Sequence, residues 1–418
     1  MSMRLCEVFL IAACAAFGQA DTTIRLDVRQ VLVPVVVTDH GGHHVAGLKE
    51  SDFEIYEDNV RQRIAGFSVE GWTSSASARD SVIQPPDSVS PAGATATATA
   101  MRAQQRTYVI CFDMLHTSFT SFVRAREALN KLFDQEKDTG SRFALISLGR
   151  ELQVVQTATT DSATLSAKIN SPAFTSTFGN MEAADFGGQI ADVTRRMAAF
   201  CSGPCSIACG PGGRPRGACD AELQQIRVNL DARGQQRSTW SEGFLAGFER
   251  LSEELAKIDG PHTIILVSDG FTLRPGAEFY SIASACVPNS PYFHFVPPYD
   301  LQLELDQCLK IAARNNIMVY TIDARGVYND TSSLAFQNTS VLSQLASATG
   351  GLFFEGNNDL LQLYRNALAD GRDYYVLAYT STNTAADGKY RRIVVKVNGK
   401  AHGVRAKQGY WAEGATSP

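Results

Sequence analysis

The chain has 418 residues, a formal net charge of −5 and a pI near 5.9. Hydrophobic residues make up 44% and charged residues 19% of it, which is the balance of an ordinary globular protein with a sizeable core. The weakly acidic charge excludes the basic footprint with which proteins bind nucleic acid or anionic membranes.

Residues 1–20 predict an export signal peptide. Arg4 lies near the start, an apolar stretch follows over 8–17, and Gly18-Gln-Ala20 offers the small residues of a cleavage site. Neither this stretch nor a later segment has the roughly 20 apolar residues of a spanning helix, so we expect no transmembrane segment. The expected location is secreted or periplasmic. A second interpretation takes Ile11-Ala-Ala-Cys14 as a lipoprotein motif, which would leave the protein lipid-anchored at the cell envelope through Cys14.

Residues 21–73 predict β-strands that cannot form a core alone. The run 31–38 is apolar and β-branched, and the alternation from Phe53 to Phe67 indicates a half-buried antiparallel hairpin. Between them, Asp39-His-Gly-Gly-His-His44 has the composition of a tight turn, with metal binding as the alternative. So short a segment makes a poor independent core, and these strands need partners from elsewhere.

Residues 74–105 are rich in Ser, Ala, Pro and Thr. Such a stretch buries too little apolar surface to fold. We therefore expect a disordered linker and a domain boundary here.

Residues 106–370 alternate between strand-like and helix-like segments, which predicts an α/β domain with a doubly wound, mostly parallel six-stranded sheet. An insertion over 171–236, which contains a cysteine cluster, is predicted to be irregular, and an amphipathic helix follows from Trp240 to Ile258. The predicted strands are 107–112, 143–147, 152–155, 263–267, 317–322 and 352–354. The other predicted helices are 122–133, a short helix capped by Asp161, 301–315, 340–348 and 358–370.

Residues 371–413 return to β-character at 374–379, 390–397 and 404–410. We expect them to pair with the N-terminal strands and complete a small β-sandwich, because both fragments are too small alone and pairing covers exposed sheet edges. The α/β domain would then be inserted between the two halves of the sandwich.

Three polar segments are predicted to meet at one edge of the sheet. Asp113-Met-Leu-His-Thr117 follows one strand, Ser268-Asp269-Gly270 ends another, and Ser238-Thr239 opens the predicted helix. Because ligands of doubly wound sheets gather at the carboxyl ends of the strands, we predict that Asp113, Thr117, Thr239 and Asp269 hold a metal ion weakly. Mg²⁺ is the natural candidate because it keeps part of its hydration shell, and Mn²⁺ is the alternative. His116 lies nearby, and as a nitrogen ligand it would shift the preference toward a transition metal.

This constellation resembles the metal-ion-dependent adhesion site of the von Willebrand factor A (VWFA) domain superfamily, over residues 106–370. The first motif of the family is Asp-x-Ser-x-Ser, and the chain departs from it at Leu115, which has no oxygen to offer, and at Thr117. The resemblance implies a protein partner whose acidic side chain completes the coordination of the ion. A metal-free site is the alternative.

Further segments resemble acidobacterial VWFA-related domain proteins, over nearly all of the mature chain. They are Val35-Val-Val-Thr-Asp39, the segment 47–58, Leu345-Ala-Ser-Ala-Thr-Gly-Gly351, Tyr374-Tyr-Val-Leu-Ala-Tyr379 and Gly409-Tyr-Trp411. This resemblance implies family membership but no general biochemical role.

Cys201, Cys205, Cys209 and Cys219 lie in one Gly- and Pro-rich stretch with little apolar material, so we expect disulfides to hold it in an oxidising compartment. Four cysteines allow three pairings, and the sequence does not choose among them. A zinc knuckle is the rival, although C-x3-C-x3-C-x9-C lacks the C-x2-C pair usual in such sites.

Three further cysteines follow from their surroundings. Cys286 and Cys308 bracket another loop and are candidates for an additional bridge. Cys111 lies in a core strand and is expected to be a buried thiol.

These observations favour an exported binding or adhesion protein that docks a protein partner through a degenerate metal site. The alternative is a metal-free structural module of the cell envelope. A hydrolase is the rival from another class, because His116, Ser118 and Ser268 lie near acidic residues. No G-x-S-x-G turn precedes a helix, and no spacing links a nucleophile, a base and an orienting acid. We therefore expect no catalytic residue and no enzyme activity.

Overall fold

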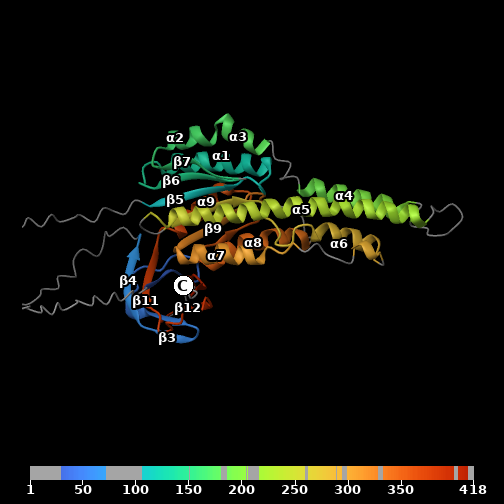
Figure 1. Ribbon diagram of the computed structural model, residues 1–418. Coiled ribbons are helices and arrows are strands. Elements are labelled where there is room, and N and C mark those ends of the chain that lie inside the picture. The colour runs from blue at the N-terminus through green and yellow to red at the C-terminus, as the bar shows by residue number, and fades with distance from the viewer. Residues whose placement is uncertain are drawn as a thin grey trace, which may run out of the picture.

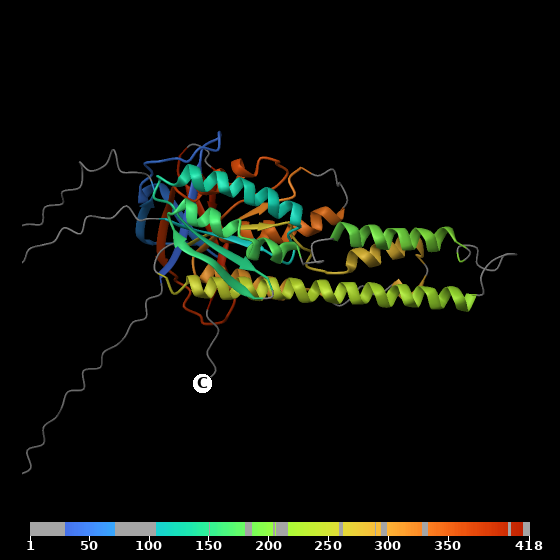
Figure 2. The ribbon, with the colours of Figure 1, turned by 90° about the horizontal axis from the view of Figure 1, so that it is seen from above.

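The computed structural model describes residues 30–71, 106–149, 151–179, 186–203, 205, 216–258, 262–288, 290–293, 299–327, 333–399 and 403–412. The predicted signal peptide, the lipoprotein motif and the predicted linker lie outside the described residues. An α/β domain, a β-sandwich and a projecting helical arm can be followed in Figures 1 and 2.

The α/β domain is built on a six-stranded sheet with the order β10-β9-β8-β5-β6-β7. Neighbouring strands run parallel, except that β7 pairs antiparallel with β6 at one edge. This confirms the predicted doubly wound, mostly parallel sheet. The strands are β5 (Thr107–Asp113), β6 (Arg142–Leu148), β7 (Leu152–Thr159), β8 (His262–Ser268), β9 (Ile317–Asp323) and β10 (Phe353–Phe354).

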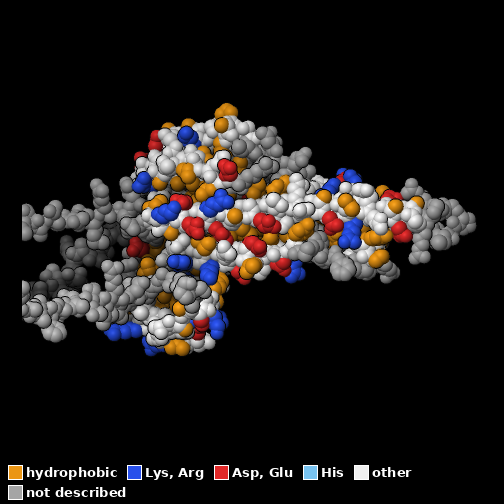
Figure 3. All heavy atoms as spheres, viewed as in Figure 1, with side chains coloured by type: hydrophobic (Ala, Val, Ile, Leu, Met, Phe, Trp, Pro, Cys, Tyr) orange, Lys and Arg blue, Asp and Glu red, His pale blue; other side chains and the backbone are white. Residues whose placement is uncertain are grey.

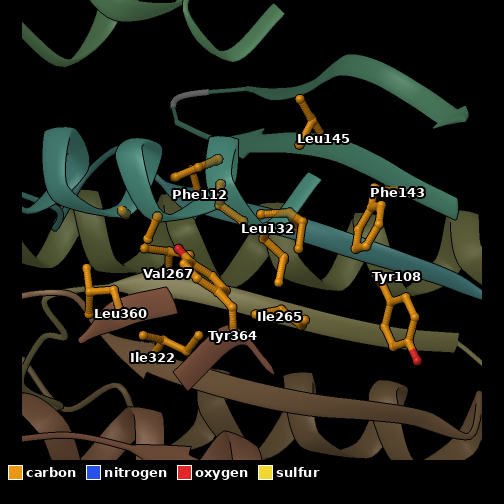
Figure 4. Close-up of a cluster of buried hydrophobic side chains, with 14 of the residues drawn as sticks. Tyr108, Phe112, Leu132, Phe143, Leu145, Ile265, Val267, Ile322, Leu360 and Tyr364 are labelled. Atoms are coloured by element: carbon orange, nitrogen blue, oxygen red, sulfur yellow. The ribbon is translucent and has the colours of Figure 1, made fainter. Parts of the chain in front are cut away.

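Helices cover both faces of this sheet, which explains why its central strands are continuous apolar runs. On one face, Phe112, Val267 and Ile322 from the strands meet Leu132 and Tyr364 from two helices (Figure 4). That face is covered by α1 (Phe119–Glu136), α2 (Ser162–Ile169), α3 (Pro172–Gly179) and α9 (Leu360–Asp370). The other face is covered by the C-terminal half of α5 (Arg216–Leu255), α7 (Gln302–Arg314) and α8 (Ser333–Thr349).

The β-sandwich consists of two four-stranded sheets with the orders β13-β1-β11-β4 and β14-β12-β2-β3. N-terminal β1 pairs with β11 and β13 of the tail, and β2 pairs with β12, so the two ends of the chain complete one sandwich as predicted. The strands are β1 (Gln30–Thr38), β2 (Phe53–Glu57), β3 (Val60–Gln62), β4 (Ile64–Glu70), β11 (Tyr374–Thr380), β12 (Tyr390–Val397), β13 (Gly403–Ala406) and β14 (Gly409–Trp411). Only β2 and β3 form the predicted hairpin, because β4 crosses to the other sheet and pairs with β11.

The sandwich is attached near the ends at which the helices of the α/β domain finish. Nη2 of Arg405 in β13 donates to both carboxylate oxygens of Asp370 at 2.6 and 2.7 Å. The hydroxyl of Tyr320 donates to the same carboxylate at 2.6 Å, and Nε2 of His44 lies 3.2 Å from it. Burial works to raise the pKa of Asp370, but its partners His44 and Arg405 outweigh burial and the pKa is lowered. We call Asp370, Arg405, Tyr320 and His44 the clasp.

A buried lysine adds a second attachment. The ammonium of Lys407 donates to the carbonyl of Ala313 at 3.4 Å and to Oδ1 of Asn316 at 3.0 Å, at the C-terminus of α7. A cation there satisfies the last carbonyls of the helix and complements its dipole. Burial nevertheless lowers the pKa of Lys407 to about 7.

The segment Asp39–His44 folds as a turn. Oδ1 of Asp39 accepts hydrogen bonds from the backbone nitrogens of Gly41 and His43 at 2.8 and 2.9 Å. Nε2 of His44 contacts Asp370 within the clasp, so Asp39 and His44 have structural partners.

The helical arm projects from the α/β domain at the edge where the strands end (Figures 1 and 2). It consists of α4 (Phe186–Ser202), the first half of α5 and α6 (Ala277–Cys286), together with the short 3-10 turn Pro291–Phe293. Its buried apolar residues are Val193, Met197, Phe200, Leu223, Leu230, Phe279, Tyr280, Ala283 and Phe293. The α5 helix is 40 residues long, or about 60 Å, and continues from the arm along the sheet.

The arm corrects the prediction that residues 171–236 are irregular. Much of that range is helical, and α5 begins at Arg216 rather than near Trp240. Apolar residues do recur there at helical spacing, as Val193, Met197 and Phe200 show. The surrounding glycines and cysteines obscured this period in the sequence.

Two disulfides hold the arm. Cys201 at the end of α4 is joined to Cys286 at the end of α6, and Cys205 is joined to Cys219 near the start of α5. These pairings use thiols that a zinc knuckle would need, which argues against that rival. Cys209 lies outside the described residues.

The predicted bridge between Cys286 and Cys308 is wrong. Cys308 is a buried free thiol of α7, and its Sγ donates to the carbonyl of Leu245 in α5. It therefore packs inside the α/β domain, while Cys286 belongs to the arm. Cys111 is a buried free thiol of β5, as predicted.

In the described ranges no helix combines the length and the apolar composition that a membrane crossing requires.

Candidate functional site

Three adjacent strands of the central sheet end in acidic residues. β5 ends at Asp113, β9 ends at Asp323, and Asp269 follows Ser268 at the end of β8. Ser268 and Asp323 are register partners, so these ends lie at one edge of the sheet. We call it the carboxyl edge, and ligands of doubly wound sheets bind at this kind of edge.

The carboxylate of Asp113 is fully buried and surrounded by donors. Its Oδ1 accepts from the backbone nitrogens of Leu115 and His116 at 3.0 and 3.1 Å. Its Oδ2 accepts from the hydroxyl of Ser268 at 2.7 Å and lies 2.9 Å from Nδ1 of His116. Because an ionised carboxylate only accepts, Nδ1 of His116 carries the proton of this contact.

The ring of His116 bridges β5 to α5. Its Nε2 lies 3.1 Å from Oγ of Ser241, and its side chain is only 8% exposed. The ring stacks on Phe271 at a centroid distance of 4.4 Å and meets Phe244 edge-on at 5.9 Å. One imidazole thus connects a strand end, the long helix and the loop that leads to α6.

Asp269 is held differently. Its Oδ2 accepts from the backbone nitrogen of Ser118 at 2.9 Å and from the hydroxyl of Ser121 at 3.0 Å. Its Oδ1 is buried and has no hydrogen-bond partner within the described part of the chain. Burial raises the pKa of Asp269 to about 6, although the bonds from Ser118 and Ser121 work against the shift.

Asp323 forms an ion pair with an arginine of the loop that follows it. Arg325 donates to both carboxylate oxygens, from Nε at 2.9 Å and from Nη2 at 2.7 Å. Arg124 of α1 holds the same loop by donating to the carbonyls of Ala324 and Arg325 at 3.3 and 2.5 Å. Each acid of the carboxyl edge therefore has partners supplied by the chain itself.

Two of the four predicted ligands do not present an open oxygen. Thr117 is buried, and its hydroxyl donates to the carbonyl of Val267 at 3.4 Å. Thr239 is exposed inside α5, and its hydroxyl donates to the carbonyl of Gln235 at 3.1 Å. Ser241 contacts His116, and residues two apart lie on nearly opposite sides of a helix, so Thr239 faces away from the site. Thr239 therefore lies inside α5, which begins at Arg216, and not at a helix start as expected.

The residues present do not fit a magnesium ion. Asp113 already has four donors, and Leu115 is buried in the apolar cluster between the sheet and α5. Among the carboxylate oxygens of Asp113, Asp269 and Asp323, only Oδ1 of Asp269 has no hydrogen-bond partner in the described part of the chain. One free carboxylate oxygen falls far short of the octahedral oxygen set that Mg²⁺ prefers. Among the described residues, no three His, Cys, Asp or Glu side chains are grouped as a metal site.

The residues of the hydrolase hypothesis are arranged differently from what was predicted. Ser268 donates to Asp113, and Ser118 donates to Ser121 while it caps α1. The hydroxyl nearest the imidazole is that of Ser241, which is 2% exposed. An acid, an imidazole and a hydroxyl do line up, but their burial leaves a substrate no access to the hydroxyl.

Sequence reasoning missed Ser241, Phe271 and the pair Asp323–Arg325. The signal for Asp323 was available, because an acid directly follows the apolar strand predicted over 317–322. No such signal was available for Ser241. The face of α5 on which Ser241 lies depends on where the helix begins, and the predicted start was wrong.

No family model matches the chain, and no curated protein does. The narrower resemblance to acidobacterial proteins therefore stays a prediction.

Solved structures give distant matches. An aerotolerance-related membrane protein from Bacteroides fragilis is 10% identical over 64% of this chain and 99% of its own, with a TM-score of 0.31. The vWF domain of the type V pili tip protein Mfa5 from Porphyromonas gingivalis is 12% identical over 63% and 94%, with a TM-score of 0.31. Proximal thread matrix protein 1 from the mussel byssus, described with a zinc-occupied MIDAS motif, is 12% identical over 64% and 48%, with a TM-score of 0.29. At these values the likeness says nothing of what this chain binds.

Proposed function

We propose that this protein is an exported interaction module that docks a protein partner with its arm and the adjoining carboxyl edge, without a metal ion. The observation that carries the proposal is the arm itself. A helical projection beside the carboxyl edge adds little to the core of the α/β domain, and it extends the surface of that edge.

The surface of the arm suits a protein partner. Acidic, basic and apolar side chains are interspersed along the visible face of the arm (Figure 3). Asp192 pairs with Arg196 and Arg233, and Arg227 pairs with Asp231, so neither sign of charge dominates. A surface of this kind lacks the single-sign field with which proteins attract nucleic acid.

The two disulfides of the arm support export, because such bonds persist in oxidising compartments. Residues 1–20 would direct this export. The mass of the mature chain tests the route: cleavage before Asp21 supports a soluble secreted or periplasmic protein, whereas a lipid on Cys14 supports the envelope anchor.

Docking is tested by capture with the immobilised full chain from an extracellular or envelope fraction, followed by mass spectrometry. Val228 is 60% exposed on α5 within the arm, and Val154 is 59% exposed on β7, so Val228→Asp and Val154→Asp form a matched pair. We expect Val228→Asp to lose a partner that the unaltered chain and Val154→Asp both retain in EDTA. A partner lost only when EDTA is added, or lost equally from both variants, contradicts the proposal.

The metal-free structural module of the envelope is the second candidate. It is favoured by the clasp, which ties the α/β domain to the sandwich as one unit. Capture that no arm substitution changes would favour it.

A further inference from the structure

We propose that the imidazole of His116 takes the place of a divalent cation at the carboxyl edge and makes the connection that an ion would otherwise make. The inference deepens the proposed metal-free docking function and rests on it for its biological meaning. Its test measures metal uptake, so failure of the inference and failure of docking can be told apart.

The Asp113 carboxylate is directed at the imidazole of His116. Its two oxygens face the imidazole, at 3.1 Å from Oδ1 and 2.9 Å from Oδ2 to Nδ1. A carboxylate that bound an ion directly or through water would turn an oxygen toward it. Here that position is filled by an N–H donor, which gives the buried carboxylate the partner it requires.

The ring also reaches α5, the element that an ion at this edge would have to reach. Nε2 of His116 lies 3.1 Å from the hydroxyl of Ser241 on α5. A shared ion would join oxygens from separate elements of the fold, and the imidazole joins a strand end to the long helix with one hydrogen bond on each side. It thereby positions α5, whose first half belongs to the arm.

Apolar side chains surround the ring. Phe271 is 1% exposed and stacks on the imidazole, and Phe244 is fully buried at its edge. Leu115 packs into the same apolar cluster. Mg²⁺ gives up its waters reluctantly, so two phenyl rings and a leucine make poor surroundings for it, whereas an aromatic ring packs well there.

The test restores an oxygen set and removes the ring. In the double variant Leu115→Ser with His116→Gly, the new serine hydroxyl adds a possible metal ligand to the side-chain oxygens of Asp113, Thr117, Ser268 and Asp269. Mn²⁺ is the probe, because free Mn²⁺ is measured directly by electron paramagnetic resonance. We expect the double variant to take up about one Mn²⁺ per chain and the unaltered chain to take up none at the same concentration.

Controls separate this site from adventitious binding. His43 is 83% exposed beside Asp39, so His43→Gly removes a histidine without touching the site and is expected to match the unaltered chain. Adding Asp113→Asn to the double variant should abolish uptake. Uptake of one Mn²⁺ by the unaltered chain that Asp113→Asn removes, or no uptake by a folded double variant, overturns the proposal.

Thermal unfolding gives a second reading. Loss of the imidazole should lower the melting temperature, and Mn²⁺ should restore it in the double variant but leave the unaltered chain unchanged, because a ligand that binds only the native state stabilises it. If the double variant does not fold, the single variant His116→Ser is used in its place. A folded His116→Ser chain whose melting temperature Mn²⁺ does not raise contradicts the proposal.

Discussion

The arm and the sandwich are both attached to the α/β domain, but different forces hold them. The arm leaves the edge where the strands end and is held by two disulfides around a small apolar cluster. The sandwich lies where the helices finish and has its own core, with Val33, Val35, Ile55, Tyr375 and Leu377 inside it. It is joined to the domain by buried polar contacts, namely the clasp and Lys407.

The difference follows from how each part connects its own elements, because the arm and the sandwich bury apolar clusters of similar size. The strands of the sandwich are hydrogen-bonded to one another along their backbones, whereas the backbone hydrogen bonds of a helix stay within that helix, so covalent links supply the cross-connections of the arm. The hydrogen-bonded sheets then need only an attachment that fixes their orientation. The arm is therefore expected to loosen locally under reducing conditions, and the sandwich to respond to pH and to charge removal.

The largest expected effect is on the arm. Replacing both Cys201 and Cys286 by Ser opens a link between residues 85 apart, which we expect to cost about 2–4 kcal/mol. Hydrogen exchange should show α4 and α6 exchanging faster while β5 and β8 keep their protection. The link between Cys205 and Cys219 spans only 14 residues, so its removal is the control with the smaller effect. Equal deprotection of arm and sheet would show that the arm is not a separate unit.

The clasp should be next in size. Arg405→Ala leaves the buried carboxylate of Asp370 without its charged donor, and hydrogen bonds to charged groups contribute about 1.5–3 kcal/mol. We expect a loss of about 2 kcal/mol in the free energy of unfolding by urea. Exposed Arg392→Ala on the same sandwich should change it by less than about 0.5 kcal/mol. Similar losses from the two variants would show that the clasp is not what holds the sandwich.

The smallest effect is a pH slope. Burial lowers the pKa of Lys407 to about 7 from 10.5, so between these values the unfolded chain binds a proton that the folded chain has released. Stability rises with pH wherever the unfolded state binds more protons. Relative to Lys407→Met, the unfolding free energy of the unaltered chain should therefore rise by about 1 kcal/mol between pH 7 and pH 8. Exposed Lys396→Met is the matched control, and a flat difference between the unaltered chain and Lys407→Met would contradict the assignment.

Much of the fold could be predicted from the sequence because the central strands have a recognisable apolar pattern. The runs ending at Asp113 and Ser268 are short, continuous apolar segments, which is the pattern of strands covered on both faces. The pairing of β1 with β11 followed from a different argument, since neither end of the chain could bury its strands alone.

The arm and the details of the site were less accessible. Cys201 pairs with a residue 85 positions away, and a disulfide reflects proximity in space, which spacing along the chain does not give. The direction of Ser241, like that of Thr239, depends on where α5 begins. The sequence predicted that Asp113, His116 and Asp269 lie at one edge of the sheet. Whether the carboxylate oxygens of the two acids are free depends on their hydrogen-bond partners, which include Ser268, Ser118 and Ser121.

The sandwich has a consequence for biosynthesis. Val35 of β1 pairs with Tyr375, so β1 leaves the ribosome before its partners, which are made some 340 residues later. At about 5–20 residues per second this delay is about 20–70 s, during which a β-branched apolar strand has no native neighbour. Any chain that stops before β11 leaves β1 permanently unmatched, with its backbone groups open to pairing with other nascent chains.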